Sequence, residues 1–157
     1  MPKIEIDGRE ITVEDGVNLI EAANRLGIEI PHYCYHPGLT IAGNCRMCLV
    51  EIEKMPKLQI ACNTRATEGM VVRTQNDKVK KAREGVLELL LINHPIDCPI
   101  CDQAGECKLQ DYYMDYDLQH SRVPLEEKVH KGKAIPIGKH VMLDARPERD
   151  PIGSKAL

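Results

Sequence analysis

The sequence predicts an α+β fold made of two small domains and an extended tail. Apolar and polar residues alternate over residues 3–13 around a turn signal, which indicates a β-hairpin. Apolar residues recur with helical spacing over residues 17–26 and again over residues 76–93. The seven cysteines form two groups, one before and one after the longer helical segment. We therefore expect one cysteine site in each domain.

The first domain is predicted to span residues 1–76, with its elements in the order of a β-grasp domain. Its hairpin turns at Asp7 and Gly8, a dipeptide that favours tight hairpin turns. The helix over residues 17–26 is expected to end before Gly27, because glycine is preferred just after the last helical turn. A loop rich in Pro, Gly, His and Tyr follows. Further strands are predicted over three segments, residues 47–53, 58–62 and 70–73.

The second domain is predicted to be small and helical and to span residues 77–117. Its long helix is expected to end at His94, because Pro95 disfavours helical backbone in the residue before it. The second cysteine group then lies in a turn-rich segment, and residues 109–118 are expected to form a short helix.

The remaining residues, 118–157, are predicted to form an extended docking segment or a partly disordered end. They contain no cysteine and show little periodicity. Their charge also differs: the chain has 13 basic and 19 acidic residues up to Asp117, whereas 8 basic and 5 acidic residues follow it. We do not expect this basic segment to form a third packed domain.

Composition excludes several classes of protein. The chain has no Trp and no Phe, but 43% of its residues are hydrophobic, so aliphatic cores are expected. Its longest run of aliphatic residues is 89–92, whereas a membrane-spanning helix needs about 20 apolar residues. The N-terminus has no apolar signal-peptide region, which predicts a reducing cytoplasm where stable disulfides are uncommon. No nucleotide-binding glycine motif is found, and no catalytic residues are predicted.

Two sets of four potential metal ligands use every cysteine of the chain. The first set is Cys34, Cys45, Cys48 and Cys62, and the second is His94, Cys98, Cys101 and Cys107. Each set contains one C-x2-C pair, which lets two sulfurs approach a metal centre from a tight turn, and two further ligands that close the site.

The spacing favours iron–sulfur clusters over structural zinc, and redox thiols are the third alternative. Zinc ribbons usually supply two C-x2-C pairs, whereas each set here has one. Plant-type 2Fe–2S ferredoxins use a first cysteine, then C-x2-C, then a distant cysteine. The first set has that order, with ten residues instead of four between its first two cysteines. Spacing alone leaves the three alternatives open.

Three segments carry a resemblance to a known family. Residues 31–37 (PHYCYHP) and 43–51 (GNCRMCLVE) closely resemble the N-terminal ferredoxin-like domain of the large iron–sulfur subunit of respiratory NADH:quinone oxidoreductase, or complex I, which is called the 75-kDa subunit in mitochondria. Residues 94–111 (HPIDCPICDQAGECKLQD) resemble the family's segment of one histidine and three cysteines. The same pair of motifs occurs in iron-only hydrogenases, NAD-linked hydrogenases and some formate dehydrogenases, but residues 97–113 resemble complex I more closely.

The resemblance implies a fold, two cofactors and a role. It implies a 2Fe–2S ferredoxin-like domain followed by a helical 4Fe–4S domain. The implied 2Fe–2S ligands are Cys34, Cys45, Cys48 and Cys62, and the implied 4Fe–4S ligands are His94, Cys98, Cys101 and Cys107. The chain would relay single electrons from reduced flavin on a partner subunit towards quinone. It would bind other peripheral-arm subunits at the cytoplasmic face of an energy-coupling membrane, with no membrane span and no nucleic-acid partner.

The sequence departs from the family after residue 144. Typical members continue with a further cluster-binding segment and a molybdopterin-enzyme-like domain, and neither is found here, so a short form, a truncated product or one piece of a split subunit is expected. Two other functions stay open. One is a small electron-transfer subunit of a hydrogenase or formate dehydrogenase, or a free-standing ferredoxin-like carrier. The weaker one is a zinc-stabilised interaction module.

Overall fold

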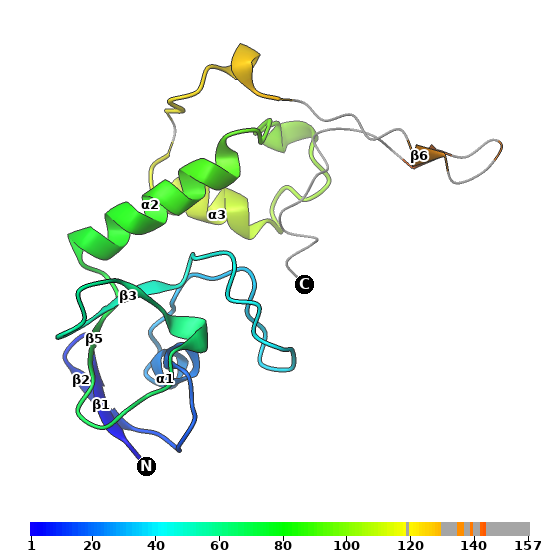
Figure 1. Cartoon of the computed structure of the whole chain (residues 1–157). Coiled ribbons are helices and arrows are strands. Elements are labelled where there is room, and N and C mark those ends of the chain that lie inside the picture. The colour runs from blue at the N-terminus through cyan, green and yellow to red at the C-terminus, as the bar shows by residue number, and fades with distance from the viewer. Residues whose placement is uncertain (119, 130–134, 137–138, 140–141, 144–157) are drawn as a thin grey trace. The chain divides into compact units, whose positions relative to one another are not determined.

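The computed structural model of the 157-residue chain describes residues 1–118, 120–129, 135–136, 139 and 142–143. The chain divides into two compact units, Met1–Val86 and a second that begins at Leu87 (Figure 1). Within the described ranges, no helix is long and apolar enough to cross a membrane.

A mixed five-stranded sheet forms the framework of the first unit. Its strands are β1 (Lys3–Ile6), β2 (Arg9–Thr12), β3 (Leu49–Ile52), β4 (Gln59–Ile60) and β5 (Val71–Arg73), in the order β2-β1-β5-β3-β4. β1 pairs in parallel with β5, and the other neighbours are antiparallel. The predicted hairpin turn is present, with Asp7 and Gly8 at φ values of 47° and 79°. Positive φ at both central residues matches the twist of the two strands that the turn joins.

Alternating burial of the strands creates one apolar face, and α1 (Leu19–Arg25) packs on it. In β1, Ile4 and Ile6 are buried, whereas Lys3 between Pro2 and Ile4 is exposed. Asn18 caps the start of helix α1, and its side chain accepts a hydrogen bond from the Glu21 N–H. The aliphatic core between helix and sheet contains Ile4, Ile6, Leu19, Ile20, Val50 and Val72.

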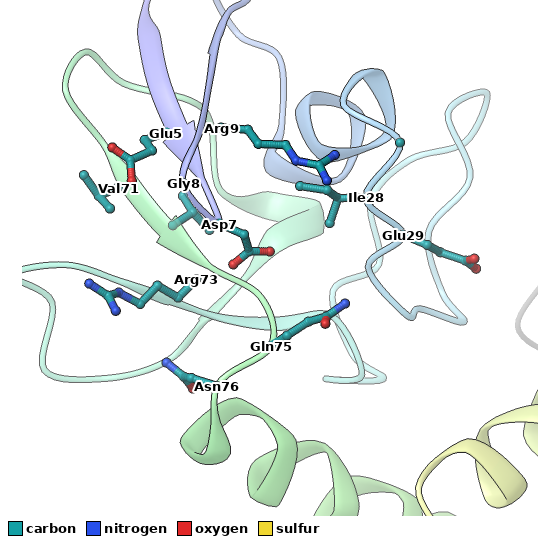
Figure 2. Close-up of a pocket in the computed structure, with 12 residues that line it drawn as sticks. Glu5, Asp7, Gly8, Arg9, Ile28, Glu29, Val71, Arg73, Gln75 and Asn76 are labelled. Carbon is teal, nitrogen blue, oxygen red and sulfur yellow. The ribbon is translucent and has the colours of Figure 1, made fainter.

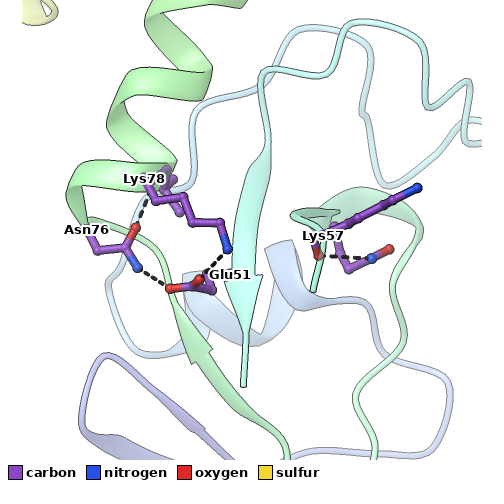
Figure 3. Close-up of polar contacts among 6 residues, drawn as sticks. Glu51, Lys57, Asn76 and Lys78 are labelled. Atoms are coloured by element: carbon purple, nitrogen blue, oxygen red, sulfur yellow. Dashed lines mark hydrogen bonds and ion pairs between the residues drawn. The ribbon is translucent and has the colours of Figure 1, made fainter. Parts of the chain in front are cut away.

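Helix α2 (Asp77–Leu91) begins in the first unit and is tied there to β3. The Asn76 side chain accepts a hydrogen bond from the Val79 N–H and caps the helix. Asn76 also donates to Glu51 of β3, and the Lys78 ammonium lies 2.7 Å from the same carboxylate (Figure 3). These contacts lower the pKa of Glu51.

Among the described residues, the second unit contains the end of α2, the helix α3 (Lys108–Asp115) and four short elements. These are the 3-10 turns η2 (Cys98–Ile100) and η3 (Leu125–Glu127), and a two-stranded pair of β6 (Ile135–Pro136) with β7 (Met142–Leu143). Leu87 and Leu91 of α2 and Leu109 and Tyr112 of α3 are buried. Both predicted helices of this region are therefore present, each within a few residues of its expected ends.

Residues 121–129, which we call the strap, follow α3 and bind the end of α2. Arg122 forms a bidentate ion pair with Glu88. The Val129 N–H donates to the Asn93 side chain at 3.1 Å. Between these two points, Lys128 donates to backbone carbonyls at the end of α2. The first part of the predicted tail is thus attached to the chain itself. Most of the rest of that tail lies outside the described residues.

Candidate metal centres

The first ligand set is assembled from a loop and the two ends of the β3–β4 hairpin. Cys34 and Cys45 lie in the segment between α1 and β3, and their sulfurs are 3.3 Å apart. Cys48 directly precedes β3, and Cys62 lies in the 3-10 turn η1 (Ala61–Asn63) that follows β4. The Cys62 thiol is within hydrogen-bonding reach of Cys48. The four thiols therefore lie together as two pairs.

Backbone pairing fixes the second of these pairs. The Ala61 N–H donates to the Cys48 carbonyl at 2.9 Å, next to the antiparallel pairing of Leu49 with Ile60. Cys48 and Cys62 are both about 1% exposed. The sequence predicted a strand over residues 58–62. The structure instead turns at Ala61, and this turn brings Cys62 back to the site.

Backbone N–H groups surround the Cys34 sulfur. Burial alone would raise the pKa of Cys34, but hydrogen bonds from Cys45, Asn44 and Gly43 outweigh it and lower the pKa. Gly43 and Arg46 both have left-handed backbone, with φ of 61° and 59°, which turns successive N–H groups of this loop inwards. Hydrogen bonds of this kind stabilise negative charge on sulfur, as a thiolate bound to iron requires.

Two other thiols of the first set, Cys45 and Cys62, are held in their neutral form when no metal is bound. Burial raises the pKa of Cys45. Burial also raises the pKa of Cys62 to about 12, and the neighbouring Cys48, Cys34 and Cys45 add to the increase. Four thiols this close together would repel one another once ionised, so they need a cation among them before all four can lose their protons. The chemistry of this donor set therefore fits a metal or an iron–sulfur cluster.

Three thiols of the second set lie together around η2 and the start of α3. Cys98 begins η2, Cys101 follows it, and Cys107 precedes α3 as its N-cap residue. Burial raises the pKa of Cys98, and the nearby Cys101 and Cys107 raise it further. The Cys101 N–H donates a hydrogen bond to the Cys98 carbonyl at 3.2 Å, and this turn sets the backbone conformation of the C-x2-C pair.

His94 lies at the end of α2, where its N–H donates to the Leu91 carbonyl at 3.1 Å. Burial lowers the pKa of its imidazole, the Lys128 charge lowers it further, and Asp97 opposes both. The imidazole is thus held in the neutral form that binds metal. Within the described ranges, no three His, Cys, Asp or Glu side chains close on a point as the ligands of one metal ion do. This holds for both ligand sets, so the described contacts bring the thiols of each set near one another without closing either set on a point. The described contacts of His94 include none with these thiols.

Two buried charged residues beside the ligand sets were not indicated by the sequence: Arg83 and Lys128, which are 4% exposed each. Arg83 donates to the Leu49 carbonyl, next to Cys48, and Lys128 donates to the carbonyl of His94 itself. No local pattern distinguishes them from exposed lysines and arginines, because both are buried by contacts with distant backbone.

A pocket of about 720 Å³ lies elsewhere in the first unit (Figure 2). It is lined by the carboxyl ends of β1 and β5 and by Ile28 and Glu29 after α1. Asp7 at its edge is held by hydrogen bonds from the backbone N–H and hydroxyl of Thr74. None of its lining residues is a cysteine or histidine, so it is separate from both ligand sets.

Comparison with known proteins identifies both regions. Residues 2–77 match the family model of a 2Fe-2S iron-sulfur cluster binding domain. Residues 83–122 match that of the NADH-ubiquinone oxidoreductase-G iron-sulfur binding region, a 4Fe–4S region. The predicted order of a 2Fe–2S domain and a 4Fe–4S region within an α+β fold is confirmed.

Among curated proteins, the chain is 59% identical over 133 residues to a subunit of the NADH-quinone oxidoreductase of Rickettsia felis, covering 85% of this chain and 20% of that protein. It is 52% identical over 120 residues to the mitochondrial NADH-ubiquinone oxidoreductase 78 kDa subunit of Candida albicans, covering 76% of this chain and 17% of that protein. The chain therefore spans about a fifth of the length of these relatives.

Among solved structures, it is similar to a chain of the NAD+-reducing [NiFe]-hydrogenase in the H2-reduced state. The TM-score is 0.69 and the identity 28%, over 78% of this chain and 53% of that one. The predicted family is confirmed by the much higher identity of the curated relatives. The chain belongs to the family of the 75-kDa iron–sulfur subunit of NADH:quinone oxidoreductase and corresponds to the N-terminal part of those proteins.

Proposed function

We propose that the chain relays single electrons through two iron–sulfur clusters as part of an NADH:quinone oxidoreductase. A 2Fe–2S cluster is bound by Cys34, Cys45, Cys48 and Cys62, and a 4Fe–4S cluster by His94, Cys98, Cys101 and Cys107. Electrons enter from the reduced flavin of a partner subunit and leave towards quinone. The observation that carries this proposal is the gathering of seven thiols into two sets, within a chain of this family.

The paired arrangement of the first set supports a two-iron cluster. Each iron of a 2Fe–2S cluster takes two protein ligands, so the cluster needs two pairs of thiols and not four at one point. Cys34 with Cys45 and Cys48 with Cys62 supply those pairs. The backbone N–H groups directed at Cys34 and Cys45 suit the charge of a cluster sulfur. A zinc ion needs all four sulfurs at one point, as ligands about 2.3 Å from the metal.

The second set supports a cluster with one imidazole ligand. Three thiols lie together, and His94 is held neutral at the end of α2, four positions before Cys98. Because imidazole replaces a negative thiolate, we expect the potential of this cluster to exceed that of an all-cysteine site.

The clusters supply one-electron chemistry when bound, and the chain supplies ligands, burial and charge. The backbone of the loop from Gly43 to Met47 orients the first set and donates hydrogen bonds to its sulfurs. The buried Cys48 and Cys62 exclude water from one side of that site. The nicotinamide, flavin and quinone sites belong to partner subunits, which also hold the chain at the cytoplasmic face of the membrane.

The structural similarity to the hydrogenase favours one alternative, an electron-transfer subunit of an NAD-linked hydrogenase. Co-purification separates the two functions. Complex I membership predicts capture of a flavin subunit together with membrane-bound subunits, whereas the alternative predicts a hydrogenase subunit.

Anaerobic metal analysis with EPR tests the cluster proposal. The expected result is about six iron and about six acid-labile sulfide per chain, with two distinct signals after reduction. Zinc without sulfide would overturn the proposal and leave the zinc-stabilised module.

A further inference from the structure

The burial of the Lys128 ammonium group needs an explanation. It is 4% exposed, and lysine is almost never buried to this extent unless it is paired. Among the described residues it forms no ion pair, and its hydrogen-bond partners are two backbone carbonyls, Leu91 at 3.3 Å and His94 at 2.7 Å. Burial lowers the pKa of Lys128, and the charge of Asp97 opposes this only in part. A further negative charge close to this site would account for the burial.

Leu91 is the last residue of α2, and its carbonyl also accepts from the N–H of His94, which lies three residues after the helix. The carbonyl groups at such an end have no partner within the helix itself. A cation here satisfies these groups and faces the negative end of the helix dipole. Because the other carbonyl that Lys128 binds is that of His94, the same side chain fixes the backbone of a proposed cluster ligand. The Lys128 charge also acts on the imidazole, whose pKa it lowers.

The strap holds Lys128 at this point from both sides. Arg122 is bound to Glu88 six residues before it, and the Val129 N–H is bound to Asn93 directly after it. The side chain is therefore set in a constrained segment. A flexible lysine on a loop would not have two anchored neighbours of this kind.

We propose that Lys128 is a positioning residue of the second cluster, which fixes His94 through its carbonyl and stabilises the reduced cluster through its charge. This inference rests on the proposed function. On reduction the cluster takes up one electron and no bond forms or breaks. The added negative charge is opposed by the buried ammonium, so the cation favours the reduced form.

Three substitutions separate the charge from the hydrogen bonds. Lys128→Met removes both, Lys128→Gln keeps a donor without charge, and Lys128→Arg keeps both. Lys81→Gln is the matched control, because it neutralises an exposed lysine of α2 and leaves the strap and the His94 carbonyl untouched. Each protein is purified anaerobically with its clusters and titrated with dithionite and mediators, and EPR follows both signals.

In Lys128→Met and Lys128→Gln we expect the reduced-to-oxidised ratio of the 4Fe–4S cluster to fall about tenfold at a fixed potential, about 59 mV for one electron. Lys128→Arg and Lys81→Gln should stay near the wild-type value, and the 2Fe–2S signal should not move in any variant. If a neutral variant loses only the 4Fe–4S cluster while Lys128→Arg keeps it, the positioning role is supported.

Unchanged 4Fe–4S potentials in both neutral variants would overturn the inference, as would an equal shift in Lys128→Arg or Lys81→Gln. A wild-type protein without a 4Fe–4S signal would instead overturn the proposed function, so the two failures are distinguishable.

Discussion

The thiols of the first set differ in pKa although all of them are cysteine side chains. Cys34 has a lowered pKa because backbone N–H groups outweigh its burial, whereas burial and neighbouring thiols raise the pKa of Cys62 to about 12. Thiolate is the reactive form, so at pH 8 roughly one Cys62 in ten thousand is reactive. The loop geometry that prepares Cys34 to bind iron therefore makes it more reactive than Cys62 in the cluster-free protein.

We expect iodoacetamide to label Cys34 well before Cys62 in folded, cluster-free protein. The labelling rate should level off at lower pH for Cys34, since its pKa is lower. Mass spectrometry of peptides at several pH values measures both rates. Denatured protein is the control, in which both cysteines should react alike. Faster labelling of Cys62 in the folded protein would contradict the assigned order.

The charge of His94, the proposed fourth ligand of the second set, should affect the potential of that cluster. His94→Cys replaces a neutral imidazole with a thiolate, so the second cluster gains one negative charge and its potential should fall. A redox titration followed by EPR measures this, and the 2Fe–2S signal in the same sample is the internal reference. An unchanged 4Fe–4S potential would remove His94 from the ligand set.

At the scale of elements, Arg83 connects helix α2 to the hairpin that carries two ligands. Its guanidinium donates from Nε at 3.2 Å and Nη2 at 2.7 Å to the Leu49 carbonyl, and it is 4% exposed. Hydrogen bonds from a charged group contribute about 1.5–3 kcal/mol, and the carbonyl would lose these partners if the side chain were removed.

Arg83→Met should therefore lower the free energy of unfolding by about 2 kcal/mol. Lys80→Met is the matched control, because Lys80 is exposed on the same helix and should change stability by less than about 0.5 kcal/mol. Denaturant unfolding of the cluster-loaded proteins measures both. Equal effects of the two substitutions would show that the Arg83 contact is not stabilising.

Local periodicity made most elements predictable, and long-range contacts account for the differences. The hairpin at Asp7 and Gly8 and the helix α2 follow from patterns within a few residues. Cys62 falls in a 3-10 turn because Ala61 bonds to the distant Cys48 carbonyl, which no local pattern records. The sequence likewise placed Lys128 in an extended tail. Its hydrogen-bond partners lie more than thirty residues earlier in the chain, so no local pattern records them either.

At the scale of the whole molecule, the two ligand sets belong to different compact units. The first set lies within Met1–Val86 and the second within the unit that begins at Leu87. Each unit has its own buried residues, and each set is shaped by hydrogen bonds made within its own unit. We therefore expect each cluster to assemble without the other.

Reciprocal substitutions test this independence, and each is the control for the other. Cys48→Ala removes one of two ligands of an iron in the first set, so the protein should lose about two iron and keep the 4Fe–4S signal. Cys101→Ala should lose about four iron and keep the 2Fe–2S signal. Iron and sulfide analysis with EPR of the reduced proteins measures both. Because ligand sets in separate units share no side chain, loss of both signals in either variant would mean that the two sites depend on each other for folding, contrary to the division of the chain at Val86.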